Sequence, residues 1–237
     1  MNISFIIPCY NCENYIKKNI LRLYKKLKIS KIKFEIILID DFSSDKTYLR
    51  LNALRNKLPK LEVLINSKNV GKSFSQIRGI KICRYNYVIL IDCDLPYFNS
   101  IPNIIKNLKK NDMVIINRRL FGSRLRKNKL NLYQLSRNFL GISINNFLRV
   151  WFKIKLQDTQ AGLKGFIKPK NFSKIKFVSK RVFFDLELIL LFIFDKKKIL
   201  SLKTTYDIAT NSNFSFFNLK RNFETFFELI KICIYYK

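Results

Sequence analysis

The sequence contains no histidine, and acidic residues, glycine and proline are scarce, with 16 Asp and Glu, 6 Gly and 5 Pro among 237 residues. Without histidine, the C-x-x-C pair of Cys9 and Cys12 cannot complete a Cys/His zinc site, and there is no second such pair. Five cysteines, an odd number lying mostly in hydrophobic segments, do not indicate a disulfide framework. We therefore expect reduced thiols and a cytoplasmic protein.

Long hydrophobic runs are also missing. The best apolar stretches, Leu186–Phe194 and Phe223–Tyr236, are both interrupted by charged residues, and neither approaches the run of about 18 apolar residues that spans a bilayer. The N-terminus starts directly with a strand-like run and lacks the basic and hydrophobic regions of a secretory signal. We expect any membrane contact to be peripheral, at the cytoplasmic face.

The charge balance is strongly one-sided, because 46 Lys and Arg against 16 acids give a net charge of +30. Such an excess favours an anionic partner, and nucleic acid, a phosphorylated substrate and an acidic membrane surface all remain open. Part of the excess reflects a general abundance of lysine. A hydrophobic content of 48% and an aromatic content of 14% predict a packed core in one domain with at most a small appendage.

The first half alternates short apolar runs with amphipathic ones, which is the pattern of βαβ units feeding a mostly parallel sheet. Continuous hydrophobicity in the runs fits strands that are buried on both faces. Ligands of such sheets bind beyond the carboxyl ends of the strands. We expect strands at about 3–8, 34–39, 61–66, 86–91 and 112–117, and helices at about 13–28, 45–57, 71–84 and 100–110.

The second half is less regular. The segment 121–131 is basic without periodicity and predicts a mobile loop, and the tail 216–237 has helical spacing with aromatics on one face. We assign 1–210 to one α/β domain and 211–237 to a C-terminal amphipathic helix. Between these segments we expect a helix at about 132–152, a polar turn entering a short strand over 157–166, a helix from about 184 and a strand at about 199–205.

Acidic residues follow two of the predicted strands. Asp92-Cys93-Asp94 comes after 87–91, and Asp40-Asp41 comes after 34–39. Two carboxylates at positions i and i+2 of an extended strand point to the same side. Although an isolated Asp-x-Asp is also common in turns, this pair is a candidate for holding a divalent metal and a diphosphate.

These short motifs resemble, in their order, those of the family 2 glycosyltransferases, which have the GT-A fold. They are Pro8-Cys9-Tyr10-Asn11, Asp40-Asp41-x-Ser43-x-Asp45, Asn69-Val70-Gly71-Lys72, Arg78-Gly79 and Asp92-Cys93-Asp94-Leu95. Further motifs resemble the branch that includes dolichyl-phosphate mannose synthase and dolichyl-phosphate β-glucosyltransferase, namely Asn117-Arg118, Leu135-Ser136-Arg137-Asn138, Asp158 to Lys164 and Phe184-Asp185-x-Glu187. The resemblance covers residues 3 to 236.

The resemblance implies an inverting, metal-dependent transfer of a hexose from a nucleotide sugar of the UDP-glucose or GDP-mannose type to a polyprenyl or dolichyl phosphate. It implies Mg²⁺ or Mn²⁺ on Asp92 and Asp94, with Asp94 as the direct ligand, and Asp158 near the reacting centre. Arg118 and Arg137 match positions that meet the diphosphate or the acceptor phosphate. The implied nucleotide-binding residues are Pro8, Tyr10, Asn11, Glu13, Asp41, Lys72 and Asp92.

The lack of histidine is compatible with this chemistry, because a phosphate monoester is already ionised at neutral pH and needs no strong general base. A hydroxyl acceptor on a surface polysaccharide or lipid-linked glycan is the alternative, and it would need a carboxylate base. Asp158, Asp185 and Glu187 are the candidates, although the latter two are equally explained as acids in the first turn of a helix. Arg118 and Arg119 could likewise be surface charges.

Three positions depart from the family pattern: Ser73 replaces a usual glycine, Pro96 a frequent polar residue, and Cys93 a usual small residue. These departures leave open a non-catalytic relative. The aromatic tail either lies on anionic lipid or packs on the domain. A nucleic-acid-binding protein is suggested only by charge, and since no recognised binding module is present we expect no nucleic-acid partner.

Overall fold

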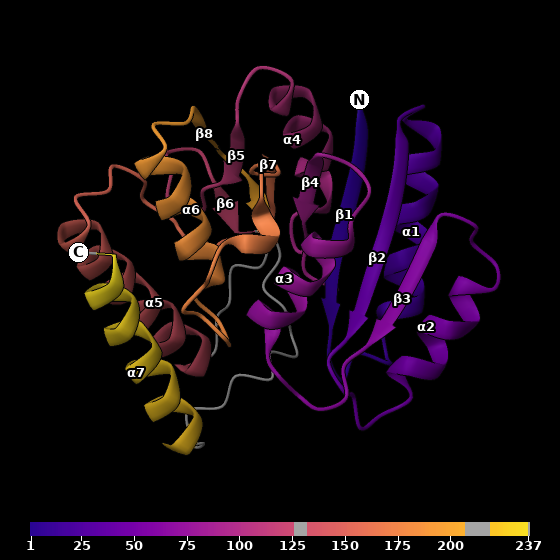
Figure 1. Ribbon diagram of the computed structural model, residues 1–237, viewed down its shortest axis with the longest axis horizontal. Helices are drawn as coiled ribbons and strands as arrows, with labels where there is room; N and C mark the ends of the chain where they lie inside the picture. The colour runs from indigo at the N-terminus through magenta and orange to yellow at the C-terminus, as the bar shows by residue number, and fades with distance from the viewer. Residues whose placement is uncertain (126–131, 207–218, 237) are drawn as a thin grey trace.

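The computed structural model describes residues 1–125, 132–206 and 219–236. Within them, seven strands form one sheet in the order β3-β2-β1-β4-β7-β5-β8 (Figure 1). The strands are β1 Asn2–Cys9, β2 Lys33–Asp40, β3 Leu61–Ile65, β4 Tyr87–Leu90, β5 Met113–Ile116, β7 Lys164–Ile167 and β8 Ile199–Leu202. Only β7 runs antiparallel to its neighbours in this sheet, so the predicted mostly parallel α/β sheet is confirmed.

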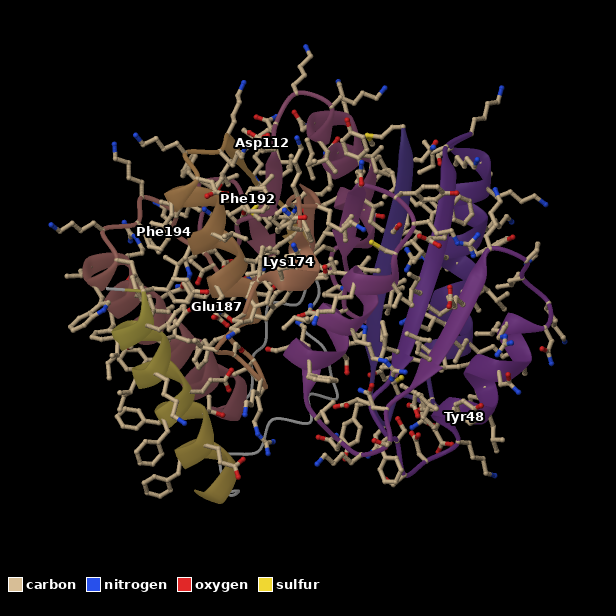
Figure 2. The ribbon with its side chains drawn as sticks, in the orientation of Figure 1. Tyr48, Asp112, Lys174, Glu187, Phe192 and Phe194 are labelled. Carbon is tan, nitrogen blue, oxygen red and sulfur yellow. The ribbon has the colours of Figure 1, made fainter. Side chains whose placement is uncertain are left out.

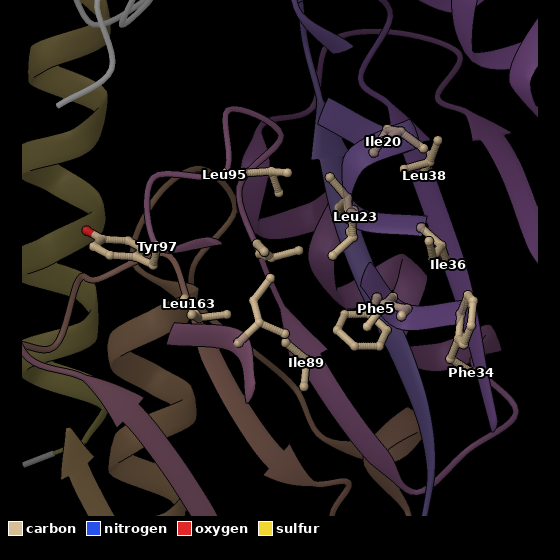
Figure 3. Close-up of a cluster of buried hydrophobic side chains, with 14 of the residues drawn as sticks. Phe5, Ile20, Leu23, Phe34, Ile36, Leu38, Ile89, Leu95, Tyr97 and Leu163 are labelled. Atoms are coloured by element: carbon tan, nitrogen blue, oxygen red, sulfur yellow. The ribbon is translucent and has the colours of Figure 1, made fainter. Parts of the chain in front are cut away.

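Helices cover both faces of this sheet. Side chains of β1 alternate between the two faces. Phe5 faces the cluster that contains Leu23 of α1 (Ile16–Ile29), which Figure 3 shows, and Ile6 faces the cluster that contains Ile80 of α3 (Lys72–Ile82). This two-sided burial explains the continuous apolar run of β1. The helices are α1 Ile16–Ile29, α2 Thr47–Arg55, α3 Lys72–Ile82, α4 Ile101–Leu108, α5 Leu132–Trp151, α6 Phe184–Phe194 and α7 Leu219–Tyr235.

Two predictions for the second half are wrong in detail. Arg124–Leu125 forms β6, which pairs with β9 (Thr205–Tyr206) in a small second sheet, so the expected loop is already a strand there. The remainder of that loop, 126–131, lies outside the described residues. The strand expected at 199–205 ends at Leu202, because the backbone of Thr204 turns away to accept a bond from Arg124 and to donate one to Ser123.

Helix α7 lies along α5 at one side of the molecule (Figure 1). Its inner residues Leu229, Ile232 and Cys233 are buried in a third cluster with residues of α5 and α6. Its outer face remains exposed, with Phe223 at 62% and Ile234 at 72%. The predicted helix is therefore present, and its inner face packs on the domain. The expected boundary at 210/211 lies outside the described residues.

Candidate active site

The loops after β1 and β2 are joined by hydrogen bonds. Asn11, at a positive φ of 45°, accepts a bond on Oδ1 from the backbone of Ser44 at 2.9 Å. Glu13 accepts one on Oε2 from the backbone of Lys46 at 3.0 Å. These predicted nucleotide-binding residues thus shape the rim of the sheet. Pro8 is buried within β1, and Tyr10 is half-buried just after it.

Asp41 fixes the glycine loop that precedes α3. Its carboxylate, 4% exposed, accepts hydrogen bonds from the amide of Asn66 at 2.8 Å, from the Val70 backbone at 3.0 Å and from the Gly71 backbone at 2.8 Å. Gly71 needs to be glycine, because its φ is +93° and a Cβ would lie 3.0 Å from the Cα of Arg181. Both carboxylate oxygens of this predicted nucleotide-binding residue therefore point to the protein backbone or to the Asn66 amide.

Asp92 and Asp94 lie in a turn and not on an extended strand, which corrects the expected geometry. Strand β4 ends at Leu90, the last residue that pairs with both β1 and β7, and the backbone of Leu95 then donates to Asp92 at 3.0 Å. Burial and the neighbouring charge of Asp92 raise the pKa of Asp94 to about 7. A cation between the two carboxylates would relieve this repulsion.

A chain of ion pairs runs inward from Asp92. Lys72, the first residue of α3, lies 2.7 Å from Asp92 and 3.8 Å from Asp185 of α6. Asp185 is in turn 2.9 Å from Lys164 of β7, whose side chain is fully buried. Burial opposes the charge of Lys72, but the carboxylates of Asp92 and Asp185 raise its pKa above the ordinary value. Helices α3 and α6 and strand β7 thus converge on the Asp92 turn.

Arg118 and Asp158 form a two-pronged ion pair. Nε of Arg118 lies 2.7 Å from Oδ2 of Asp158 and Nη2 lies 2.9 Å from Oδ1. Although burial works to raise the pKa of Asp158, the hydrogen bonds and charge of Arg118 lower it below the ordinary value. Arg118 is therefore not an isolated surface charge. Arg137 lies in α5, and its side chain lies outside the described part of the chain.

Arg149 was not singled out in the sequence, and Arg119 was named there only together with Arg118, with a surface charge as the alternative. The Nε atoms of both arginines are buried without a hydrogen-bond partner, as is Nε2 of Gln160. Burial, and to a smaller extent the charges of Arg118 and Arg149, lower the pKa of Arg119, against the nearby charge of Asp158. Arg149 lies one turn after Asn145 on α5, and that asparagine accepts two bonds from Thr159. This long-range contact places Arg149 near the 157–160 turn.

Glu187 is an internal hydrogen-bond acceptor and not a base facing substrate. It is fully buried and accepts bonds from the backbones of Val178 at 2.8 Å and Ser179 at 2.6 Å, and from the hydroxyl of Tyr236 at 2.9 Å. Figure 2 shows it projecting from α6 on the side of α7. Asp185, the other candidate base in α6, is held by Lys164.

The residues around the Asp92 turn fit a divalent cation for which the protein supplies only some of the ligands. Among the described residues no three His, Cys, Asp or Glu side chains gather as a complete metal site, so protein side chains of these types do not by themselves complete the coordination of a cation at Asp92 and Asp94. Mg²⁺ is commonly bound by one or two carboxylates, with waters and substrate phosphates as the other ligands. The donor set therefore suits a metal that arrives with a nucleotide diphosphate.

Comparison with known families identifies the class of protein. A sequence profile of glycosyl transferase family 2 matches residues 4–180, three quarters of the chain. The chain belongs to this family.

Two curated relatives are dolichyl-phosphate beta-glucosyltransferases. The protein of Trichomonas vaginalis is 24% identical over 99% of this chain and 74% of its own length. The protein of Dictyostelium discoideum is 30% identical over 70% of this chain and 54% of its own length. A dolichol-phosphate mannosyltransferase of Pyrococcus furiosus is 30% identical over 50% of this chain and 33% of its own length, so the chain spans only part of each of these relatives.

Solved structures share the fold. Glucosyl-3-phosphoglycerate synthase from Mycobacterium tuberculosis superposes with a TM-score of 0.69 at 16% identity, covering 98% of this chain and 79% of that one. The S. aureus TarS protein superposes with a TM-score of 0.56 at 18% identity, covering 90% of this chain and 60% of that one. At these identities the similarity establishes the GT-A architecture alone.

Proposed function

We propose that this protein transfers a hexose from a nucleotide sugar to a polyprenyl phosphate, with help from a divalent metal. In this family 2 chain, the Asp92-Asp94 turn meets the Gly71-Lys72 loop through the Lys72–Asp92 ion pair. It also meets the segment that follows the Arg118-Asp158 pair, since Gly162 lies against the Asp92 carboxylate, and this meeting is the observation that carries the proposal. The names of the curated relatives, which act on dolichyl phosphate, support the acceptor class.

On the donor side, Asp92 and Asp94 would hold the metal, and Lys72 would meet the diphosphate. Mg²⁺ or Mn²⁺ bound there supplies Lewis-acid stabilisation of the charge that develops on the leaving diphosphate. The mycobacterial synthase with the same architecture has been crystallised with Mn²⁺ and UDP-glucose, which supports a metal and a uridine donor as the first choice. The rim made by Asn11 and Glu13 would receive the nucleoside, beside the Gly71 loop that Asp41 holds in place.

On the acceptor side, Arg118 and Arg137 are the residues that the family resemblance nominates, and Arg119 and Arg149 add unpartnered buried donors nearby. Arginine forks suit the oxygens of a phosphate monoester. Because such a phosphate is ionised at neutral pH, its oxygen attacks the sugar without losing a proton. A hydroxyl acceptor is less favoured, since the base it needs, Asp158, is engaged by Arg118 and has a lowered pKa.

A lipid acceptor requires access to a membrane surface. No helix in the described residues is long and apolar enough to cross a bilayer. The outer face of α7 instead carries exposed apolar side chains, Phe223, Phe226, Phe227, Ile234 and Tyr235, and the exposed Lys231. Aromatic and basic residues together favour an interfacial helix on anionic lipid. We infer that the protein is peripheral, at the cytoplasmic face of the membrane.

A thermal-shift panel of UDP- and GDP-sugars with Mn²⁺ tests the donor site. A ligand at a hundred times its Kd stabilises the folded state by about 2.7 kcal/mol, which raises the Tm by about 5 to 10 °C in a chain of this size. We expect one sugar nucleotide to do this only with Mn²⁺, and Asp94→Ala to remove the shift while keeping the fold. If no sugar nucleotide raises the Tm, the proposal is wrong. Transfer of labelled sugar to polyprenyl phosphate then tests the acceptor.

A further inference from the structure

Helix α7 contacts a loop as well as the neighbouring helices. Glu228, 8% exposed, accepts hydrogen bonds on its Oε1 from the Ser179 hydroxyl, from the Lys180 backbone at 3.0 Å and from the Arg181 backbone at 3.2 Å. Hydrogen bonds to an ionised carboxylate are about twice as strong as neutral ones. One side chain of α7 therefore fixes three successive residues of the 179–181 loop.

The same loop caps the start of α3. The backbone of Ser73 donates to the Arg181 carbonyl at 3.0 Å, and the backbone of Phe74 donates to the Lys180 carbonyl at 3.3 Å. These N–H groups belong to the first turn of the helix, where no partner exists within the helix itself. The 179–181 loop thus supplies acceptors that α3 lacks.

Ser73 adds a side-chain link between the loop and the helix. Its hydroxyl lies 3.0 Å from the Ser179 hydroxyl and accepts a bond from the backbone of Phe184 at 3.3 Å. Because Ser179 gives its hydrogen to Glu228, Ser73 is the donor in the hydroxyl pair. The residue that departs from the glycine usual in the family is therefore an anchor of this contact.

The residue before Ser73 is Lys72, whose ammonium group lies 2.7 Å from Asp92. The backbone here has little room to shift, since a Cβ on Gly71 would lie 3.1 Å from the Lys180 carbonyl oxygen. A continuous set of contacts consequently leads from Glu228 through the loop and Ser73 to the Asp92 turn.

We propose that α7 positions the donor site: Glu228, acting through the 179–181 loop and Ser73, holds Lys72 against Asp92. Glu228 touches no reacting atom and is a positioning residue. This proposal rests on the proposed function in one respect, the identity of the ligand at Lys72 and Asp92, which is a metal-bound nucleoside diphosphate.

Glu228→Leu replaces the acceptor carboxylate with an apolar side chain of similar size. Glu224→Leu is the matched control for a surface contact with the same loop. Glu224 lies one turn earlier on α7 and is 39% exposed, and it pairs at 2.8 Å with the partly exposed side chain of Arg181, a surface ion pair that contributes little to stability. Hydrogen exchange of the peptides covering 71–82 and 178–184 reports the loop contact without any ligand. Titration with Mn²⁺ and UDP, or with GDP if the panel selects guanosine, reports the donor site.

We expect Glu228→Leu to speed exchange at the start of α3 and to weaken Mn²⁺-nucleotide binding about tenfold, the size of one charge-assisted hydrogen bond. Glu224→Leu should leave both unchanged, and Glu228→Gln, which keeps an acceptor oxygen, should restore most of the affinity. Three results for Glu228→Leu would each overturn the proposal. Hydrogen exchange in 71–82 could be unchanged, exchange could be faster uniformly over the sheet, or exchange at the start of α3 could change while the nucleotide affinity stays the same. If the wild-type protein binds no nucleotide, the proposed function fails, whereas the exchange comparison still decides whether Glu228 holds α3.

Discussion

Gly162 lies directly against Asp92. A methyl group added at Gly162 would overlap the Asp92 carboxylate, and no other glycine of the described chain would be blocked by an acidic side chain. The motifs Asp92-Cys93-Asp94 and Asp158 to Lys164 thus meet at Asp92 and Gly162, which are 70 positions apart in the sequence. The absence of a side chain at Gly162 sets the position that the Asp92 carboxylate can occupy.

Gly162→Ala is therefore expected to push Asp92 out of place and to abolish the Mn²⁺-dependent nucleotide shift. Gly141→Ala is the control, because a Cβ there meets nothing within 4 Å, and alanine in a helix is favoured over glycine by about 1 kcal/mol. Thermal unfolding of both variants, with and without Mn²⁺ and nucleotide, measures the shift. If the Gly162→Ala protein binds Mn²⁺ and nucleotide as the wild type does, the contact between Gly162 and Asp92 is not needed for the donor site.

Replacing Lys72 should change metal and nucleotide affinities in opposite directions. Lys72 competes with a divalent cation for the Asp92 carboxylate, yet it adds positive charge for a diphosphate. For Lys72→Met we expect Mn²⁺ alone to bind about three- to tenfold more tightly, and nucleotide with saturating Mn²⁺ to bind more weakly by a similar factor, since the pair is partly exposed. Titration followed by electron paramagnetic resonance measures the Mn²⁺ affinity, and calorimetric titration measures the nucleotide affinity. The exposed Lys68→Met is the charge-matched control, and a parallel loss of both affinities would contradict the competition.

Asp158 should stabilise the fold in a pH-dependent way. Its pKa in the folded protein lies below the ordinary value of 3.8, so the folded state binds fewer protons than the unfolded state in that range. Asp158→Asn leaves Arg118 without its partner and should lower the free energy of unfolding by about 3 kcal/mol at neutral pH, the lower end for breaking a buried pair. Urea unfolding should show this difference shrinking as the pH falls below about 4. The exposed Asp195→Asn should have little effect, and a difference independent of pH would exclude the ion pair as its cause.

Membrane binding should depend on the outer face of α7. Replacing Phe223, Phe226 and Phe227 by serine removes exposed aromatics without touching the buried contacts of the helix. We expect the wild-type protein to float with vesicles that contain anionic phospholipid at low salt, and the triple variant to stay behind. Serine at Tyr48 and Leu49, exposed on α2 at the other side of the molecule, is the control (Figure 2). A wild-type protein that does not float would remove the membrane assignment.

Local patterns were sufficient for much of the fold. Nearly continuous apolar runs predicted β1 and β2 to within two residues, because strands buried on both faces carry apolar side chains on both; the buried exceptions within these runs, Ser4 and Glu35, are hydrogen-bonded to each other. The rim of the sheet followed from chain order, since parallel strands bring their carboxyl ends to one edge. Helix boundaries were less accurate: α1 starts at Ile16 because Glu13 is bonded to the loop after β2.

The partner of each acidic side chain was decided by the tertiary structure. The sequence left Asp185 and Glu187 equally well explained as acids at the start of a helix and as catalytic bases. In the structure Asp185 pairs with Lys164. Glu187 accepts hydrogen bonds from Val178, Ser179 and Tyr236. Arg149 carried no signal at all in the sequence. Side-chain contacts of this kind join residues tens of positions apart, and periodicity reports only on neighbours along the chain.

The sequence by itself determined the α/β class, the order of the strand-end motifs and the family, because burial period and short motifs are local properties. Only the tertiary structure decided that Asp92 and Asp94 lie in a turn, that Ser73 anchors a loop and that α7 packs on one face while exposing the other. Those outcomes depend on which distant segments pack together, and that packing is settled by the whole core at once.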